Sequence, residues 1–373
     1  MARTRVPLGK FVKEYSVRNR ENKNIPVYSV TNSQGFCTGY FGKEVASKDK
    51  TTYKIVQRGH FAYNPSRINV GSVDWQRCED RVIVSPLYNV FSVSGGLDKQ
   101  YLYYFLKSDI GRQMINAKAA GSVRDNLKLE MLKEMTIPAL SAEEQKLYVF
   151  VLDKLQELID LRNQQLSAFD TLVKARFVEM FGDCKNTLSL ADLCSIITDG
   201  THQPPKFQAR GIPFIFVSNL SDNKVTYNAE KFISDETYAE LIKRTPIEKG
   251  DVLLSTVGSY GHPAVVVEDT KFLFQRHIAY LKPKHDLLNS FYLHSALLAP
   301  DGQRQIEEKV KGIAQKTLNL SEVKRILIPV PSLELQNQFA AFVSQVDKSK
   351  VVVQKALDES QLLFDSLMQQ YFG

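Results

Sequence analysis

The decapeptide TIPALSAEEQ at residues 136–145 returns in related form as LIPVPSLELQ at residues 327–336, an offset of 191 positions. The flanking residues repeat at the same offset. The matched pairs include Leu127 with Leu318, Lys133 with Lys324, Ile137 with Ile328, Gln145 with Gln336, Gly111 with Gly302, Gly121 with Gly312, and Phe181 with Phe372. Upstream, IPVYSVTN (25–32) resembles IPFIFVSN (212–219) at an offset of 187, which one gap explains. The chain is a tandem duplication, so we expect two related halves.

Each copy divides into an irregular first part and a helical second part. In the first parts, short β-rich runs such as DRVIVSPLYNVFSV and GDVLLSTV alternate with Gly and Pro. Each first part closes with an apparent helix, around KQYLYYFLKSDIGRQMI and LNSFYLHSALLAPDGQRQI. The second parts contain no Pro or Gly between their opening turn and a terminal Phe-Gly. The predicted boundaries are 1–140, 141–183, 184–331 and 332–373.

The helical parts carry the 4,3 spacing of apolar residues that is typical of a coiled coil. In the first copy this seam consists of Tyr148, Leu152, Leu155, Ile159, Leu166, Phe169, Val173 and Met180, and it is broken by Arg162 and Arg176. In the second copy it consists of Phe339, Val343, Val346, Val353, Leu357, Phe364, Leu367 and Tyr371, and it is broken by Lys350 and Ser360. Ser141 and Ser332 are placed to cap the two helices, and Glu143 and Glu334 favour their positive ends.

The duplication also predicts how the helices pair. A helix of about 38 residues would be roughly 57 Å long. The second β-rich part begins almost directly after Gly182, so the second helix buries its seam most simply by returning antiparallel along the first. We therefore predict an α+β fold in which two β-rich domains are separated by two long antiparallel helices, with an internal pseudo-twofold repeat. Such a chain suits a long ligand with approximate dyad symmetry, above all B-DNA. A structural spacer between two protein partners predicts the same helices.

Composition narrows the class of protein. Hydrophobic residues make up 43% of the chain and charged residues 24%, which is ordinary for a globular protein. No apolar run approaches the roughly 20 residues that span a bilayer, and no signal peptide is apparent, so we expect a cytoplasmic protein without a membrane partner. The four cysteines (Cys37, Cys78, Cys184, Cys194) lack metal-ligand spacing, so we expect no metal site. The net charge of +7 and the pI near 9.0 permit nucleic-acid binding without proving it.

With these motifs in this order, the chain resembles the DNA-specificity (S) subunit of type I restriction–modification systems. In that family two target-recognition domains alternate with two similar helical regions. Motifs similar to one type of recognition domain are YSVTNSQGF (28–36), GHFAYNPSRINVGSV (59–73) and VIVSPLYNVF (82–91). Motifs similar to another type are ITDGTHQPP (197–205), GIPFIFVSNLS (211–221) and KGDVLLSTVGSYG (249–261). The helix starts at 137–145 and 328–336 are typical of the helical regions, and the resemblance covers essentially the whole chain.

The resemblance implies a recognition subunit that catalyses nothing and binds no cofactor itself. It implies a bipartite double-stranded DNA target, with one half-site read by each recognition domain and a spacer set by the helices. The implied partners are two modification subunits, which supply S-adenosylmethionine and adenine N6-methylation. Restriction subunits for ATP-dependent translocation and cleavage complete the implied complex.

Motifs for an enzyme of the fused restriction–modification type are incomplete. NPS (64–66) partly resembles the (N/D)PP(Y/F) loop of adenine methyltransferases, but the second Pro and the aromatic residue are missing. EEQK (143–146) contains the E-x-K of nucleases, but it lies in a predicted helix start without an upstream Pro-Asp. The Walker-type phosphate loop is absent. A non-catalytic scaffold remains a further alternative.

Candidate DNA-contacting residues are the polar side chains in loops next to predicted strands, because such groups read base edges and phosphates. In the first domain they are Asn32, Ser33, Gln34, Asn64, Ser66, Arg67 and Asn69. In the second domain they are Thr201, His202, Gln203, Lys206, Arg210, Ser259, Tyr260 and Arg276. The alternative for each is structural: Asn, Ser and Gly shape turns, 199–210 forms a surface loop, and Arg276 lies in a strand.

Overall fold

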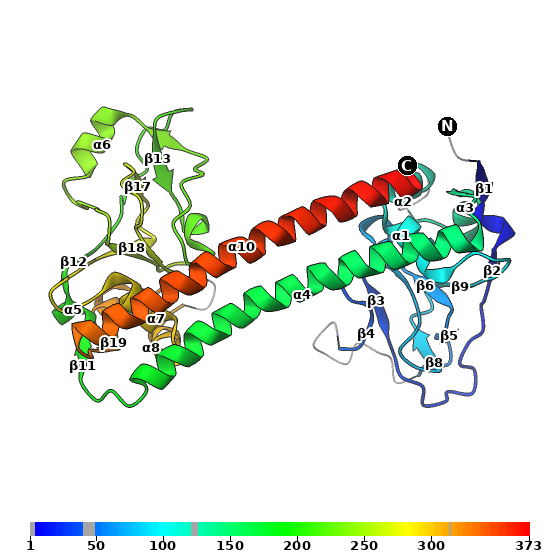
Figure 1. Cartoon of the computed structure of the whole chain (residues 1–373), viewed down its shortest axis with the longest axis horizontal. Helices are drawn as coiled ribbons and strands as arrows, with labels where there is room; N and C mark the ends of the chain where they lie inside the picture. Colours follow the sequence, from blue (N-terminus) through cyan, green and yellow to red (C-terminus); the bar gives the residue numbers. More distant parts are fainter. Residues whose placement is uncertain (1–3, 40–48, 121–125, 313–314) are drawn as a thin grey trace. The chain divides into compact units, whose positions relative to one another are not determined.

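The computed structural model describes residues 4–39, 49–120, 126–312 and 315–373. The chain forms two compact units, Met1–Asn163 with Lys355–Gly373 (the first unit) and Gln164–Gln354 (the second unit). Both contain a part of each of the two 40-residue helices, α4 (Ala142–Phe181) and α10 (Leu333–Phe372) (Figure 1).

The first unit is built on a four-stranded antiparallel sheet with the strand order β2-β9-β6-β7. Two-stranded sheets β3-β4 and β5-β8 adjoin it, and β1 pairs with β10. Its elements are β1 (Arg5–Pro7), η1 (Leu8–Lys10), β2 (Val12–Glu14), β3 (Ser29–Thr31), β4 (Gly35–Cys37), β5 (Lys54–Gln57), β6 (Phe61–Tyr63), η2 (Ile68–Val70), β7 (Val73–Trp75), β8 (Arg81–Val84), β9 (Asn89–Val93), α1 (Lys99–Lys107), α2 (Asp109–Ala119), α3 (Leu129–Glu134) and β10 (Thr136–Pro138).

The second unit repeats this plan with the sheet β12-β18-β15-β16, and β11 pairs with β19. Its elements are β11 (Thr187–Ser189), α5 (Leu190–Leu193), β12 (Cys194–Asp199), β13 (Ile212–Ile215), η3 (Val217–Leu220), β14 (Phe232–Ile233), α6 (Asp235–Leu241), β15 (Val252–Ser255), β16 (Pro263–Val265), β17 (Leu273–Phe274), β18 (Ile278–Pro283), α7 (Ser290–Leu298), α8 (Pro300–Lys309), α9 (Leu320–Val323) and β19 (Leu327–Pro329). The offset of 191 aligns β9, β6 and β7 with β18, β15 and β16, and β2 and β12 occupy the same edge position in the two sheets, so the strand order is duplicated. A three-stranded sheet, β14-β13-β17, distinguishes the second unit.

Each predicted closing helix is in fact two helices. In the first unit Ser108 is extended between α1 and α2, and its hydroxyl accepts a hydrogen bond from the backbone N–H of Gly111 at 3.1 Å. In the second unit Pro300 occupies the first turn of α8, where its missing N–H costs nothing. Gly111 and Gly302 allow the two sharp corners, because a Cβ there would collide with the carbonyl oxygen of Phe105 or Ala296.

The long helices pair antiparallel within each unit. In the first unit Tyr148, near the start of α4, stacks on Tyr371, near the end of α10, with ring centroids 3.7 Å apart. In the second unit Phe177, near the end of α4, lies 5.5 Å from Phe339, near the start of α10. Every apolar seam residue predicted from the sequence is buried or half-buried. The predicted α+β fold with two β-rich domains, two long antiparallel helices and an internal repeat is confirmed.

The helix starts follow the capping prediction. The hydroxyl of Ser141 accepts a hydrogen bond from the backbone N–H of Glu144 at 3.2 Å, and the Glu144 carboxylate accepts one from the Ser141 N–H at 2.8 Å. This reciprocal pair is a capping box. Ser332 accepts from the N–H of Leu335 at 3.4 Å. Serine therefore ends the preceding extended segment and begins the long helix in both copies.

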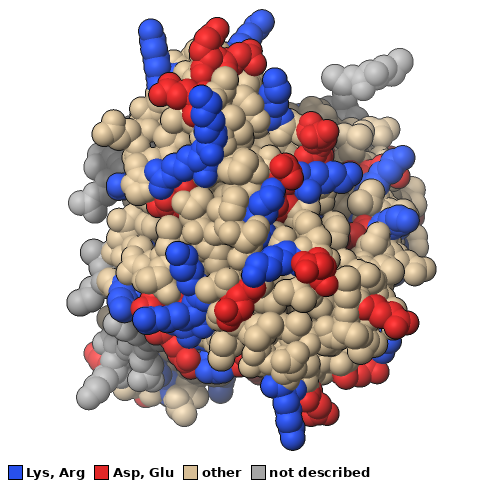
Figure 2. All heavy atoms as spheres, turned by 90° about the vertical axis from the view of Figure 1, so that its left-hand side faces the viewer, with Lys and Arg blue, Asp and Glu red and all other residues tan. Residues whose placement is uncertain are grey.

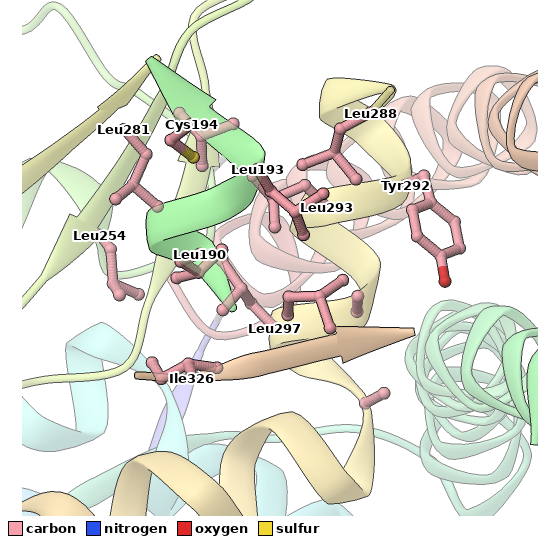
Figure 3. Close-up of a cluster of buried hydrophobic side chains, with 14 of the residues drawn as sticks. Leu190, Leu193, Cys194, Leu254, Leu281, Leu288, Tyr292, Leu293, Leu297 and Ile326 are labelled. Atoms are coloured by element: carbon pink, nitrogen blue, oxygen red, sulfur yellow. The ribbon is translucent and has the colours of Figure 1, made fainter. Parts of the chain in front are cut away.

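Apolar side chains join the sheet to the helices. In the second unit, leucines of α5 and α7 point toward one another above β19, and Leu254 and Leu281 approach from the sheet (Figure 3). Tyr292 of α7 extends this core to Phe177, Phe181 and Phe339 of the long helices. The equivalent core of the first unit contains Tyr101, Leu152 and Phe372. Each sheet is thus fixed to the long helices, which gives the loops at its ends a rigid support.

Candidate nucleic-acid interface

Equivalent ends of the two main sheets carry most of the predicted contact residues. In the first unit β6 and β7 are joined at this end by loop 64–72, where Tyr63 pairs with Val73. In the second unit β15 and β16 are joined by loop 256–262, where Leu254 pairs with Pro263. The duplication therefore places two related loops on two rigid sheets.

Loop 64–72 is closed by hydrogen bonds of its own. The side-chain oxygen of Asn64 accepts from the N–H of Ser66 at 3.1 Å and from its hydroxyl at 2.9 Å. The Arg67 carbonyl accepts from the N–H of Ser72 at 3.1 Å. Asn64 and Ser66 thus shape the turn, as the structural alternative predicts, whereas the side chains of Arg67 and Asn69 are exposed. The Asn69 side-chain oxygen accepts from the Val70 N–H at 3.0 Å, and no hydrogen bond within the described residues uses its amide nitrogen.

The other first-unit candidates lie in the β3–β4 turn beside this loop. Asn32, Ser33 and Gln34 are exposed in the turn. The Ser72 hydroxyl donates to the Val30 carbonyl of β3, which holds the hairpin against the loop. Asn32 lies so close to Gly71 that a Cβ on that glycine would come within 2.6 Å of the Asn32 side-chain oxygen. The structure therefore brings both groups of first-unit candidates together.

In the second unit the sheet end gathers residues from three separate segments. Asp199 at the end of β12 pairs with Ala279 of β18, and Ser255 at the end of β15 pairs with Ile278. Thr201 follows β12, and its carbonyl accepts from the N–H of Arg276 at 3.1 Å. Arg276 is exposed in the turn between β17 and β18 and does not lie in a strand. Thr201, Arg276 and loop 256–262 thus share one end of the sheet.

A pocket of about 590 Å³ adjoins this end, between segment 200–206 and residues of α6 and the turn that follows it. Its lining includes the predicted residues Thr201, His202, Gln203 and Lys206. His202 contacts the Asp199 carboxylate at 2.9 Å, and Arg244 contacts it at 2.7 Å. The Asp199 carboxylate therefore holds the side chains of His202 and Arg244, which both line the pocket, in place.

The side chains of the remaining candidates differ in their hydrogen-bond partners and in where they lie. The Tyr260 hydroxyl donates to the Glu307 carboxylate, and the Lys316 ammonium lies 3.2 Å from the same hydroxyl. Ser259 is exposed at the tip of the loop. Arg210 is exposed before β13, at the opposite end of that strand from Ile215, whose carbonyl accepts from the Gln275 N–H at 3.1 Å. The structure thus does not bring Arg210 into the group around Thr201 and Arg276.

The sequence reasoning missed several residues next to these loops. Lys243 and Arg244 line the pocket, and the basic pair in IKRTP was a usable signal for them. Lys107 and Gln303 bind loop carbonyls through their side chains, as described below. No local sequence pattern reveals such contacts, because their partners are main-chain atoms 36 and 42 positions away.

One face of the molecule carries side chains of both charges (Figure 2). Basic and acidic side chains are interspersed over the face seen in Figure 2. Burial lowers the pKa of His277, and the adjacent Arg276 lowers it further, so this imidazole is neutral at pH 7 and can both donate and accept.

In the described part of the chain, no group of three or more His, Cys, Asp or Glu side chains could hold a metal ion. None of the described helices is both long and apolar enough to cross a membrane.

A family model described as the type I restriction modification DNA specificity domain matches residues 9–168 and 185–359, once for each copy of the repeat. The specificity subunit of the type I restriction enzyme EcoBI from Escherichia coli is 29% identical over 170 residues, which cover 46% of this chain and 36% of that protein. The MjaIX specificity subunit from Methanocaldococcus jannaschii is 22% identical over 297 residues, which cover 73% and 68%. The match thus spans little more than a third of the EcoBI subunit.

Solved structures share the fold over nearly the whole length. The S subunit of a type I restriction–modification system from M. genitalium superposes with a TM-score of 0.56 and 15% identity, covering 99% of this chain and 96% of that one. A chain from a study of complex assembly and conformational transition of the type I R-M system gives a TM-score of 0.60 and 19% identity, covering 99% and 97%. At these identities the likeness concerns the fold.

Proposed function

The chain belongs to the type I restriction modification DNA specificity family, and from this premise we propose that it is the sequence-specificity subunit of a type I restriction–modification complex. In this proposal residues 1–140 and 184–331 are target-recognition domains, and 141–183 and 332–373 are helical spacer regions. Each recognition domain reads one half of a bipartite double-stranded DNA target. The helices set the spacer between the two half-sites.

The observation that carries the proposal is the duplicated sheet end. Two sheets with the same strand order present polar loops at equivalent ends, in a chain whose sequence repeat extends through both. The loops themselves differ, since NPSRINVGS in one copy stands where TVGSYGH stands in the other. A common scaffold with different loops suits a protein that reads two different half-sites in a related geometry.

We assign contacts by the chemistry of the exposed groups. We refer to residues 32–34 and 64–71 of the first unit, and to 257–261 of the second, as the recognition loops. Arg67 and Arg276 are the candidates for bidentate contact with guanine, and the free amide nitrogen of Asn69 can donate to a base acceptor. The remaining predicted residues are assigned to polar contacts with bases or phosphates, namely Asn32, Ser33, Gln34, Asn64, Ser66, Thr201, His202, Gln203, Lys206, Arg210, Ser259 and Tyr260.

The partners follow from the proposed role. Two modification subunits supply the methyl donor and transfer the methyl group to adenine, and restriction subunits add cleavage. The chain itself supplies recognition and no catalysis. Its location in the cytoplasm follows from the same role, because the target is the DNA of the cell or DNA that has entered it.

The test is methylation mapping by sequencing in a host that carries this chain with its modification subunit. The expected result is one bipartite motif, with specific binding by the complex exceeding non-specific binding by about 10³ or more at physiological salt. Arg67→Ala and Arg276→Ala are each expected to relax one half-site and to leave the other unchanged. Equal binding of the assembled complex to all DNA would favour a scaffold, and methyl transfer by the isolated chain would favour an enzyme.

A further inference from the structure

Lys107 links the two recognition segments of the first unit. It is the last residue of α1 and is half-buried. Its ammonium group donates to the Asn32 carbonyl at 3.0 Å and to the Gly71 carbonyl at 2.5 Å. Asn32 opens the β3–β4 turn and Gly71 lies near the end of the β6–β7 loop, so one side chain bridges the segments that carry all first-unit candidates.

Gly71, Asn32 and Lys107 lie in close contact at the junction that Lys107 bridges. Gly71 has a φ of +94°, a backbone conformation that favours glycine. A Cβ at this position would lie 2.6 Å from the Asn32 side-chain oxygen and 3.4 Å from the Lys107 ammonium. The ring of Tyr103 lies 5.6 Å from the same ammonium. Asn32, Gly71, Tyr103 and Lys107 also line a pocket of about 280 Å³. The two hydrogen bonds of Lys107, and not close packing on every side, therefore limit how far the two segments can separate.

In the second unit Gln303 of α8 has an equivalent role from a different position. Its amide nitrogen donates to the Gly261 carbonyl at 3.0 Å and to the Leu297 carbonyl at 2.8 Å. Gly261 closes the loop that carries Ser259 and Tyr260, and its N–H donates to the Ser255 carbonyl at 2.9 Å. Gln303 therefore fastens the end of this recognition loop to the α7–α8 corner, beside the hydrogen bond between Tyr260 of the loop and Glu307 of α8.

The two anchors are not copies of each other. At the offset of 191, Lys107 corresponds to Leu298 and Gln303 corresponds to Arg112. Each unit thus fixes its own loop with a side chain of the adjoining helix pair that the other unit lacks. This is expected where loops have diverged on a shared scaffold, since each new loop needs its own support.

We propose that Lys107 and Gln303 are positioning residues that set the base discrimination of their own unit without touching DNA. The inference rests on the proposed function of the recognition loops. A loop held in one conformation does not spend binding free energy on ordering, and its base-reading groups stay in register with one sequence. A loop released from its anchor can adapt to several sequences, so it loses selectivity more than it loses affinity.

The test uses the full chain assembled with its modification subunits. Selection from a pool of DNA duplexes with randomised half-sites measures discrimination at each half-site separately. Lys107→Met is expected to lower discrimination roughly tenfold at one half-site, about the weight of one good base contact, and to leave the other half-site unchanged. Gln303→Leu is expected to do the reverse, so each variant is the matched control for the other.

Conservative variants separate positioning from general damage. Lys107→Arg retains donors for both carbonyls and is expected to restore discrimination, and Lys107→Gln, which retains fewer donors, is expected to be intermediate. If Lys107→Met does not fold, the order of the wild type, Lys107→Arg and Lys107→Gln decides in its place. A wild-type complex without half-site preference would contradict the proposed function itself. A selective wild type whose variants remain selective, or lose both half-sites together, would overturn this inference.

Discussion

The side-chain oxygen of Gln145 accepts a hydrogen bond of 2.8 Å from the backbone nitrogen of Asp98, the N-cap residue of α1. The Gln145 amide nitrogen donates to the carbonyls of Gly96 and Leu140. Gln336 of the second copy makes the same three bonds, with the nitrogen of Asn289 and the carbonyls of Leu287 and Pro331. The final Gln of the repeated decapeptide thus fastens the first turn of a long helix to the helix pair of its unit.

Loss of this glutamine should therefore destabilise its unit. Gln145→Leu leaves the half-buried Asp98 N–H without its partner, and we expect the free energy of unfolding to fall by about 2 kcal/mol. Gln336→Leu is expected to have a similar effect. Urea denaturation measures both. Gln165→Leu, at an exposed position of α4, is the matched control and should change stability by less than about 0.5 kcal/mol. Equal effects of Gln145→Leu and Gln165→Leu would contradict this role.

Replacing Gly111 by alanine should destabilise the protein, although it lies in a helix. Replacing glycine by alanine inside a helix ordinarily stabilises by up to about 1 kcal/mol. At Gly111 the new Cβ would meet the Phe105 carbonyl oxygen at the α1–α2 corner, so we expect destabilisation of about 2 kcal/mol or more. Gln113→Ala, on the exposed face of α2, should be neutral or slightly stabilising. A rise in the melting temperature of Gly111→Ala would show that the corner opens freely.

The buried carboxylate of Asp74 should make stability depend on pH. Burial raises the pKa of Asp74, although Arg77 and the N–H groups of Trp75 and Phe36 oppose the shift. A carboxyl group whose pKa is higher in the folded state binds its proton more tightly there. Its contribution to stability therefore falls as pH rises from the usual aspartate range through the raised pKa.

Asp74→Asn removes this titration. The variant loses hydrogen bonds and is expected to be less stable than the wild type at acidic pH, but the deficit should shrink as pH rises above about 4 through the raised pKa of Asp74. Urea denaturation across this range gives the difference in the free energy of unfolding. Asp80→Asn, whose side chain is 99% exposed, should show no such trend. A deficit that grows with pH would reverse the assigned sign.

How much of the molecule the sequence predicts depends on whether the determining contacts are local. The seam of α4 and α10 follows from a periodic pattern, so residues such as Ile159 and Val346 were correctly expected to be buried. The break at Ser108 was missed, because a serine followed by an acidic residue also fits inside a continuous helix. The four-stranded order of each sheet was not predicted, since it depends on pairings between strands as distant as β2 and β9.

In the candidate site too, features set by the local sequence were predicted, and contacts between distant segments were not. Loop 64–72 was expected from its turn residues, and its internal hydrogen bonds fit that expectation. The approach of Asn32 to Gly71, and of Thr201 to Arg276, required the sheet to be known. Arg210 follows Lys206 by four residues along the chain. It nevertheless lies at the far end of β13 from the Thr201 group. Proximity in sequence was a poor guide because Arg210 lies just before the start of β13, whereas Ile215 at the end of that strand lies next to Gln275 and the Thr201 group.

Lengthening both long helices should lengthen the spacer between the two half-sites. Both α4 and α10 run from one unit into the other, and duplicating one heptad in each adds two turns, or about 10.5 Å. Duplicating residues 157–163 and 355–361 repeats Ile159 and Arg162 of one seam and Leu357 and Ser360 of the other, so the apolar faces stay in register. At about 3.4 Å per base pair, we expect the spacer of the methylated motif to lengthen by about three base pairs, with both half-sites unchanged.

Methylation mapping distinguishes the outcomes. The same seven residues inserted after Asp183, outside the helices, should leave the spacer length unchanged, because a flexible connection adds no fixed distance. A new half-site sequence at constant spacing would mean that the helices act on base reading rather than on distance. An unchanged motif in the helix variant would mean that the spacer is set elsewhere in the complex. Only a longer spacer between the original half-sites supports the helices as the element that measures distance along DNA.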